Sequence, residues 1–141
     1  MSASKTIKLM KEKEVEYVDL RFTDPRGKLQ HLTMDGKMVD EKMLNEGVFF
    51  DGSSIAGWKA INESDMILKP DLERQIIDPF TSHTTLVLFC DVIDAVKKDP
   101  YERDPRSIAK KAEAYLKKSG IGDKAYFGPE AEFFVFDDVK Y

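Results

Sequence analysis

The sequence predicts a small α+β domain with the beginning of a second domain attached to it. Apolar and polar residues alternate from 18 to 23, a turn follows, and residues 29–34 form a second such segment, which together indicate a β-hairpin. Residues 86–92 are the most hydrophobic run in the chain and indicate a central strand. A polar stretch with two prolines, 97–105, separates this region from a single regular helix.

Composition and charge exclude several classes of protein. The chain has 141 residues, of which 42% are hydrophobic and 34% charged, as expected for a folded domain whose core needs no disulfides. The net charge of −4 comes without a basic block, so no nucleic-acid partner is expected. No apolar segment approaches the roughly 20 residues of a membrane span, so no membrane partner is expected. The lone Cys90 is expected to be buried, and with no signal peptide it predicts a cytoplasmic protein.

The first third of the chain carries the first predicted helix and the hairpin. Residues 4–13 are predicted to form a short helix capped by Ser4. The hairpin turn at 24–28 reads Asp-Pro-Arg-Gly-Lys, in which proline presets one backbone angle and glycine tolerates a positive one.

The middle of the chain is predicted to be less regular. Residues 39–46 are predicted to form a short helix that ends at Gly47. Residues 48–65 combine glycines and serines with large apolar side chains, so they are expected to form an ordered loop. A short strand at 66–68 is expected to end at Pro70.

The last third is interpreted as the beginning of a second domain. Asp104 suits the cap of a helix, Pro105 its first position and Gly120 its end. An aromatic-rich strand is expected at 125–135. One helix and one strand cannot enclose a core, so the sequence is interpreted as cut rather than complete.

A pair of glutamates, Glu130 and Glu132, is the first candidate for chemistry. Residues two apart in a strand point to the same face, so both carboxylates would share one face. They could each hold one metal ion of a pair, or both approach one ion, and an oxygen-only set favours Mg²⁺ or Mn²⁺. On the pattern alone, two solvated glutamates at a strand edge are the other interpretation.

A second candidate, Asp51, opens the loop Asp51-Gly-Ser-Ser54. A carboxylate followed by glycine and two hydroxyls could bind a cation or accept a proton, or it could form an Asx-turn that satisfies its own backbone. The apolar residues that flank the loop either dock on another surface or anchor the loop to its own core; they are Val48, Phe49, Phe50 and Trp58. The two histidines, His31 and His83, are expected to be structural or exposed rather than metal ligands.

Two longer motifs resemble the glutamine synthetase family. The stretch Phe50-Asp-Gly-Ser-Ser-Ile-Ala-Gly-Trp58, followed by Asn62-Glu-Ser-Asp-Met66, is similar to the amino-terminal signature of bacterial type I glutamine synthetases. The stretch from Tyr126 to Asp137, Tyr-Phe-Gly-Pro-Glu-Ala-Glu-Phe-Phe-Val-Phe-Asp, is similar to the start of their catalytic domain. The resemblance implies a β-grasp-like amino-terminal domain over 1–104 and the first helix and strand of the catalytic domain over 105–141.

The resemblance also implies an activity and a set of site residues. The family is a glutamate–ammonia ligase that makes glutamine from glutamate and ammonia through a γ-glutamyl phosphate, with ATP as co-substrate and two Mg²⁺ or Mn²⁺ ions in the complete site. Glu132 matches the ligand of the metal that clamps glutamate, and Glu130 matches a ligand of the metal associated with ATP. Asp51 matches the aspartate that binds ammonium and helps to deprotonate it, and Ser54 is a further catalytic candidate in the same loop.

The resemblance further implies partners outside the chain. Family members are homo-oligomeric dodecamers in which the Asp51-type loop reaches a neighbouring subunit's site, so Trp58 is expected at an interface. The other metal ligands, the nucleotide pocket and the glutamate-binding arginines are expected after residue 141, so the chain alone is expected to be inactive and to bind Mg²⁺ weakly. Two alternatives stay open: a stand-alone interaction module that docks on full-length subunits and modulates them, and a relative that uses another amine or acid.

Overall fold

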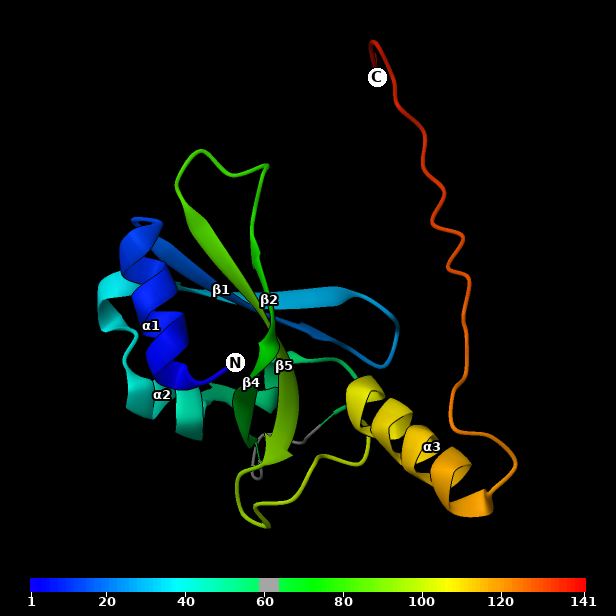
Figure 1. Cartoon of the computed structure of the whole chain (residues 1–141). Coiled ribbons are helices and arrows are strands. Elements are labelled where there is room, and N and C mark those ends of the chain that lie inside the picture. Colours follow the sequence, from blue (N-terminus) through cyan, green and yellow to red (C-terminus); the bar gives the residue numbers. More distant parts are fainter. Residues whose placement is uncertain (59–63) are drawn as a thin grey trace.

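The computed structural model describes residues 1–58 and 64–141. Its strands are β1 (Tyr17–Thr23), β2 (Leu29–Asp35), β3 (Val48–Asp51), β4 (Asp65–Ile77) and β5 (Thr85–Asp94). Its helices are α1 (Ala3–Glu12), α2 (Glu41–Glu46) and α3 (Pro105–Ser119), with 3₁₀ turns at Gly36–Met38 and Gly52–Ser54. The strands form one mixed sheet in the order β2-β1-β5-β4-β3, in which β1 and β5 are parallel and the other neighbours antiparallel (Figure 1). The predicted α+β class is confirmed.

The core lies between one face of this sheet and the two amino-terminal helices (Figure 1). Because side chains alternate along a strand, Leu20 on β1 and Leu88 on β5 both point inward, and both are fully buried. Met10 of α1 and Leu44 of α2 close the core from the other side. Cys90 is buried in the same core, and burial raises the pKa of its thiol, which confirms the predicted apolar role.

The hairpin and the first helix follow the sequence prediction closely. β1 and β2 pair in register from one end to the other, with Val18 opposite Met34. The first helix is confirmed, but its cap is Ser2 rather than Ser4, because the Ser2 side chain accepts the backbone N–H of Lys5.

Two predictions for the middle of the chain are wrong. The ordered loop expected at 48–65 contains β3, which pairs antiparallel with the start of β4; its residues 59–63 lie outside the described part of the chain. Pro70 does not end β4, which continues to Ile77 with a shift in register between Pro70 and Gln75. Proline cannot donate to the ladder, and a strand tolerates it where the pairing is irregular.

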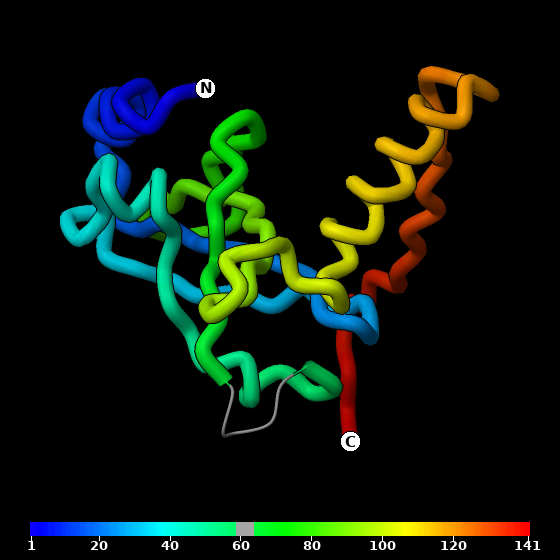
Figure 2. Tube along the Cα trace, turned by 90° about the horizontal axis from the view of Figure 1, so that it is seen from below, coloured from blue at the N-terminus to red at the C-terminus, as the bar shows by residue number. Residues whose placement is uncertain are grey.

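The helix predicted after the polar stretch is confirmed with its caps. The Asp104 carboxylate accepts the backbone N–H groups of Arg106 and Ser107, and Gly120 ends α3 with a left-handed backbone at φ 70°. The first turn of α3 is attached to the sheet by Arg106, which forms ion pairs with Asp71 of β4 and Asp91 of β5. Lys110, one turn further on, also pairs with Asp91, and beyond it the helix extends away from the sheet, on the side opposite α1 and α2 (Figure 2).

The strand expected at 125–135 does not form. Residues 121–141 carry no regular secondary structure and run as an extended segment that stands apart from the sheet (Figure 1). A strand is stable only when its N–H and C=O groups are paired, and among the residues that the structure describes none pairs with this segment. No helix in the described ranges is both long and apolar enough to span a bilayer.

Candidate functional site

Asp51 sits at the point where β3 passes into the 3₁₀ turn Gly52–Ser54. The antiparallel pairing of β3 with β4 places it opposite Asp65 at the edge of the sheet. Its Oδ1 accepts the backbone N–H of Ser53 at 2.8 Å and the Ser53 hydroxyl at 2.6 Å. This is the Asx-turn considered as one alternative, and it holds the carboxylate in a defined orientation. Ser54, the other catalytic candidate, is exposed in the same turn.

The hydrogen bonds around Asp51 favour the ionised form of its carboxyl group. The hydroxyl of Ser53 contributes most to lowering the pKa of Asp51, followed by the Ser53 backbone N–H, and the Ser64 side chain adds to the effect. The carboxylate itself is exposed. An oriented, ionised and accessible carboxylate is suited to attract a small cation. Because a lowered pKa makes it a weak base, it takes up a proton readily only when the proton donor is held next to it.

The loop after Asp51 depends on a close approach of two backbones. The N–H of Gly52 donates to the carbonyl of Ser64 at 2.7 Å, and Gly52 is buried. A Cβ atom at this position would lie 2.5 Å from Cγ of Met66. Because Gly52 has no Cβ atom, the turn can pack closely against the start of β4, directly beside the carboxylate of Asp51.

An aromatic cluster anchors the far end of the loop. The indole of Trp58 packs against Phe22 and Tyr101, with ring centroids 5.6 Å and 5.5 Å away, and against Phe50 at 6.1 Å. Trp58 is only 6% exposed. The expectation that it lies at an interface is therefore wrong, and the alternative in which apolar residues anchor the loop to its own core is confirmed for Trp58.

Glu130 and Glu132 lie on the extended carboxyl-terminal segment, and both are exposed. Further along the segment, the rings of Phe134 and Phe136 lie 6.1 Å apart. Within the described residues no group of three or more acidic, histidine or cysteine side chains could hold a metal. The structure places the glutamates on a different segment from Asp51 and Ser54, and no hydrogen bond or ion pair between described residues joins the two sets.

The donor set of the two glutamates can be compared with what a divalent ion requires. Mg²⁺ and Mn²⁺ prefer oxygen ligands, and carboxylates suit both ions. Mg²⁺ takes about six ligands, several of which are waters. Glu130 and Glu132 therefore fit such an ion by type and would supply part of its ligand set.

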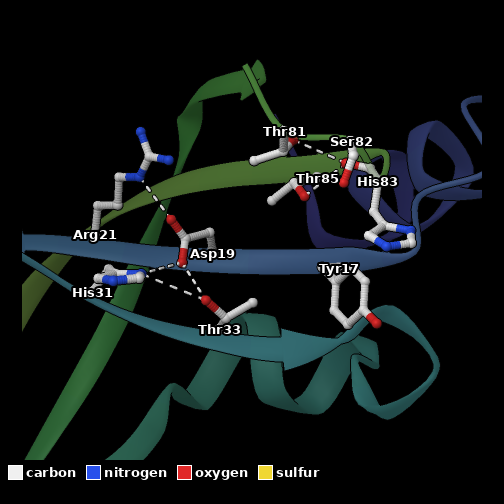
Figure 3. Close-up of a pocket in the computed structure, with 9 residues that line it drawn as sticks. All are labelled: Tyr17, Asp19, Arg21, His31, Thr33, Thr81, Ser82, His83 and Thr85. Atoms are coloured by element: carbon white, nitrogen blue, oxygen red, sulfur yellow. Dashed lines mark hydrogen bonds and ion pairs between the residues drawn. The ribbon is translucent and has the colours of Figure 1, made fainter. Parts of the chain in front are cut away.

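A polar cluster on the open face of the sheet was not recognised in the sequence (Figure 3). The buried Asp19 carboxylate accepts from Arg21 Nε at 2.7 Å and Thr33 Oγ1 at 2.8 Å, and His31 Nδ1 lies 2.8 Å away. Arg21 also bonds Asp78 in the loop before β5. The sequence predicted the hairpin but not its register, and it is the observed register that sets Asp19 opposite Thr33 and Arg21 opposite His31.

The two histidines lie along the same shallow hollow, although they are far apart in sequence (Figure 3). His31 contacts Asp19, and His83 Nδ1 lies 3.0 Å from Glu16. Both rings are largely exposed and each faces one carboxylate. The expected structural or exposed role is confirmed for both.

The hydrogen bonds around Asp19 are expected to make the stability of the fold depend on pH. Burial alone would raise the pKa of Asp19, but hydrogen bonds from His31, Arg21 and Thr33 outweigh burial and lower it below its ordinary 3.8. A carboxyl with a lowered pKa in the folded state stabilises the fold above the unfolded-state pKa, and this contribution is lost as the pH falls through the folded-state value.

We expect Asp19→Asn to lower the free energy of unfolding by about 1–3 kcal/mol at pH 7, since it removes hydrogen bonds from charged donors. Urea unfolding at pH 7 and at pH 3 measures this. The wild-type chain should lose more stability between the two values than the variant does. An equal loss in both proteins would show that Asp19 does not contribute to acid sensitivity.

The chain matches two models of known protein families. Residues 14–95 match the family model described as glutamine synthetase, beta-Grasp domain, and residues 102–141 match that of the glutamine synthetase catalytic domain. The chain belongs to the glutamine synthetase family. The two matches follow each other in the order that the motifs predicted.

Individual glutamine synthetases are similar over the whole chain. The chain is 64% identical to that of Rhizobium meliloti (strain 1021) over 140 residues, or 99% of its length, and 57% identical to that of Methylococcus capsulatus over 141 residues. It spans about 30% of the length of each of these relatives. The glutamine synthetase of Plasmodium falciparum, solved by cryo-electron microscopy, superposes with a TM-score of 0.78 at 26% identity over 88% of this chain and 24% of that one.

A second solved structure bears on the fold alone. GmaS in complex with ADP superposes with a TM-score of 0.72 at 22% identity, over 80% of this chain and 25% of that chain. The predicted β-grasp-like fold agrees with the family model and is shared with the solved glutamine synthetase.

Proposed function

We propose that this chain is the amino-terminal portion of a glutamate–ammonia ligase, which joins glutamate and ammonia into glutamine with ATP through γ-glutamyl phosphate. The observation that carries the proposal is the 64% identity to a glutamine synthetase over 99% of the chain. We further propose that residues 1–104 are its β-grasp domain and residues 105–141 the start of its catalytic domain. The proposed setting is the cytoplasm.

In this proposal Asp51 binds the ammonium ion. Its carboxylate is oriented by Ser53 and kept ionised at neutral pH, as a cation-binding group must be. Ammonium must lose a proton before it can attack an acyl group, and the same carboxylate would take up that proton and so free the lone pair of the nitrogen for the attack. Ser54 is proposed to line the same site from the exposed side of the turn.

Glu130 and Glu132 are proposed to bind metal in the complete enzyme. Glu132 would hold the ion that clamps glutamate, and Glu130 the ion associated with ATP. When bound, Mg²⁺ or Mn²⁺ would neutralise phosphate charge, which is the main requirement of phosphoryl transfer. In this chain both carboxylates are accessible on an extended segment, so they are free to join ligands from elsewhere.

The proposed assembly is a homo-oligomer of the dodecameric type, in which the Asp51 loop serves a neighbouring subunit. An exposed carboxylate on an internally anchored loop supports such a role, because it can be presented outward without the loop moving. The comparisons give no support to the alternative of a stand-alone interaction module. The Asp51 loop favours ammonia over another amine as the nucleophile.

A chimera tests the proposed function. Residues 1–141 are joined to the remaining part of the Rhizobium meliloti relative, and glutamine formation from glutamate, ammonium and ATP is measured with Mg²⁺. We expect the chimera to make glutamine and the isolated chain to make none. The matched control is the chimera with Glu132→Gln, which keeps the size of the side chain and removes the proposed ligand charge.

Two outcomes would contradict this assignment. An assembled wild-type chimera without ATP-dependent glutamine formation would overturn the proposed function. A Glu132→Gln chimera with unchanged activity and unchanged dependence on Mg²⁺ would remove Glu132 from the proposed metal set.

A further inference from the structure

The loop that begins at Asp51 has a second attachment, which comes from the segment before α3. The guanidinium of Arg103 donates through Nη1 to the carbonyl oxygen of Gly57 at 2.9 Å and lies 3.4 Å from that of Trp58. The donor is charged, and such hydrogen bonds are stronger than those between neutral groups. Arg103 therefore holds the loop by its backbone, at the end opposite to Asp51.

The segment that carries Arg103 is itself attached to the centre of the sheet. Two residues before it, the N–H of Tyr101 donates to the carbonyl of Val92 at 2.8 Å. Directly after it, the buried carboxylate of Asp104 accepts the N–H of Val92 at 3.3 Å and caps α3. Both backbone groups of one residue on β5 thus position the Tyr101–Asp104 segment, so Arg103 extends from a rigid support.

The aromatic cluster makes the same connection through packing. Tyr101 stacks edge-on against Trp58, whose backbone carbonyl lies near Arg103. The loop is consequently held by two contacts from one short segment: the ring of Tyr101 packs against Trp58, and the side chain of Arg103 bonds the loop backbone. Inside the loop, Ile55 donates to Gly52 and Trp58 donates to Ile55, so the constraint continues back to the turn beside Asp51.

We propose that Arg103 is a positioning residue for Asp51, which holds the loop in the conformation that presents the carboxylate to ammonium. This inference rests on the proposed function, and it assigns a role in that function to a residue outside the Asp51 motif. Arg103 touches no reacting atom and acts only through the loop. It also links the loop mechanically to the first helix of the catalytic region, because Asp104 caps that helix.

The proposal predicts a particular kinetic signature. If the loop is in the competent conformation for only a fraction of the time, the apparent affinity for ammonium falls by that fraction. Saturating ammonium restores the lost population, so kcat is kept. A residue needed only for folding would instead reduce the amount of active enzyme, which lowers kcat and leaves the KM for ammonium unchanged.

The first experiment measures the attachment in the chain itself. Amide hydrogen exchange at Ile55 and Trp58 is compared between the wild type, Arg103→Met and Arg103→Lys. We expect exchange about ten-fold faster in Arg103→Met, the factor that corresponds to losing one hydrogen bond from a charged donor. Arg103→Lys keeps one charged donor and should show a partial effect. The matched control is Arg74→Met, an exposed arginine in β4 without a described side-chain partner.

The second experiment measures the consequence in the chimera. We expect Arg103→Met to raise the KM for ammonium by roughly five- to ten-fold while kcat, the KM for ATP and the KM for glutamate stay within about two-fold. Arg103→Lys should recover part of the loss. The emission of Trp58, the single tryptophan, reports whether the aromatic core is still packed in each variant.

The outcomes separate this proposal from the function on which it rests. A wild-type chimera without activity overturns the proposed function and the positioning role together. An active wild-type chimera in which Arg103→Met leaves the KM for ammonium unchanged overturns the positioning role alone. Unchanged hydrogen exchange in Arg103→Met also overturns it, because the loop is then held without Arg103.

Discussion

Replacing Asp51 by asparagine is expected to lower kcat/KM for ammonium in the chimera by about 10²–10⁴-fold, the range attributed to a positioned acid or base. The substitution is almost isosteric, and the amide oxygen can still accept from the N–H and hydroxyl of Ser53. The turn should therefore persist while the negative charge is lost. An uncharged amide neither attracts ammonium as strongly nor takes up its proton.

The measurement is a steady-state titration of ammonium at saturating ATP and glutamate. The control is Asp65→Asn, since Asp65 lies directly opposite Asp51 in the β3–β4 pairing and is also exposed. Only the Asp51 variant should lose activity. A similar loss in both variants would indicate that surface charge near the loop, and not a specific carboxylate, is what the enzyme needs.

Replacing Gly47 by alanine is expected to lower the free energy of unfolding by about 3–5 kcal/mol. Gly47 ends α2 with φ 90° and ψ −176°, a backbone region that is almost restricted to glycine. A Cβ atom there would lie 2.5 Å from the carbonyl oxygen of Leu68 and 2.6 Å from Cγ2 of Ile67. The backbone cannot yield at this point without moving β3 away from β4.

Gly27→Ala is the matched control, because Gly27 has φ +86° but no atom within 4 Å of a Cβ built there. It should cost only about 1–2 kcal/mol, the penalty of the left-handed backbone alone. Urea unfolding followed by Trp58 fluorescence measures both variants. Equal losses would mean that contact with β4 is unimportant. A larger loss at Gly47 would confirm that this glycine sets the position of β3, and therefore of Asp51.

Local signals in the sequence were sufficient for the elements whose stability is local. The hairpin follows from alternation and from a turn that contains Gly27. The last helix follows from a capping aspartate, Asp104, and a glycine end, Gly120. In each case neighbouring residues alone determine which backbone conformation has its hydrogen bonds satisfied.

Elements that depend on distant partners could not be predicted in the same way. β3 has only four residues, and it is a strand because β4 pairs with it. Residues 125–135 have a strand-like pattern but form no strand, since no described strand pairs with them. The burial of Trp58 depends on Tyr101, which lies far away in sequence, so the sequence left its two interpretations open.

The same distinction between local and long-range interactions applies to the candidate site. The sequence by itself was sufficient to indicate the family, because its motifs are contiguous and their order is specific. Through that resemblance it also named the Asp51-Gly-Ser-Ser54 loop and the Glu130/Glu132 pair as candidates. Only the tertiary structure decided that the Ser64 side chain, directly before β4, adds to the lowering of the pKa of Asp51, and that Arg103 holds its loop. Those interactions join segments through space, and their strength depends on distance, orientation and burial, which are set when the strands pair and the aromatic cluster packs.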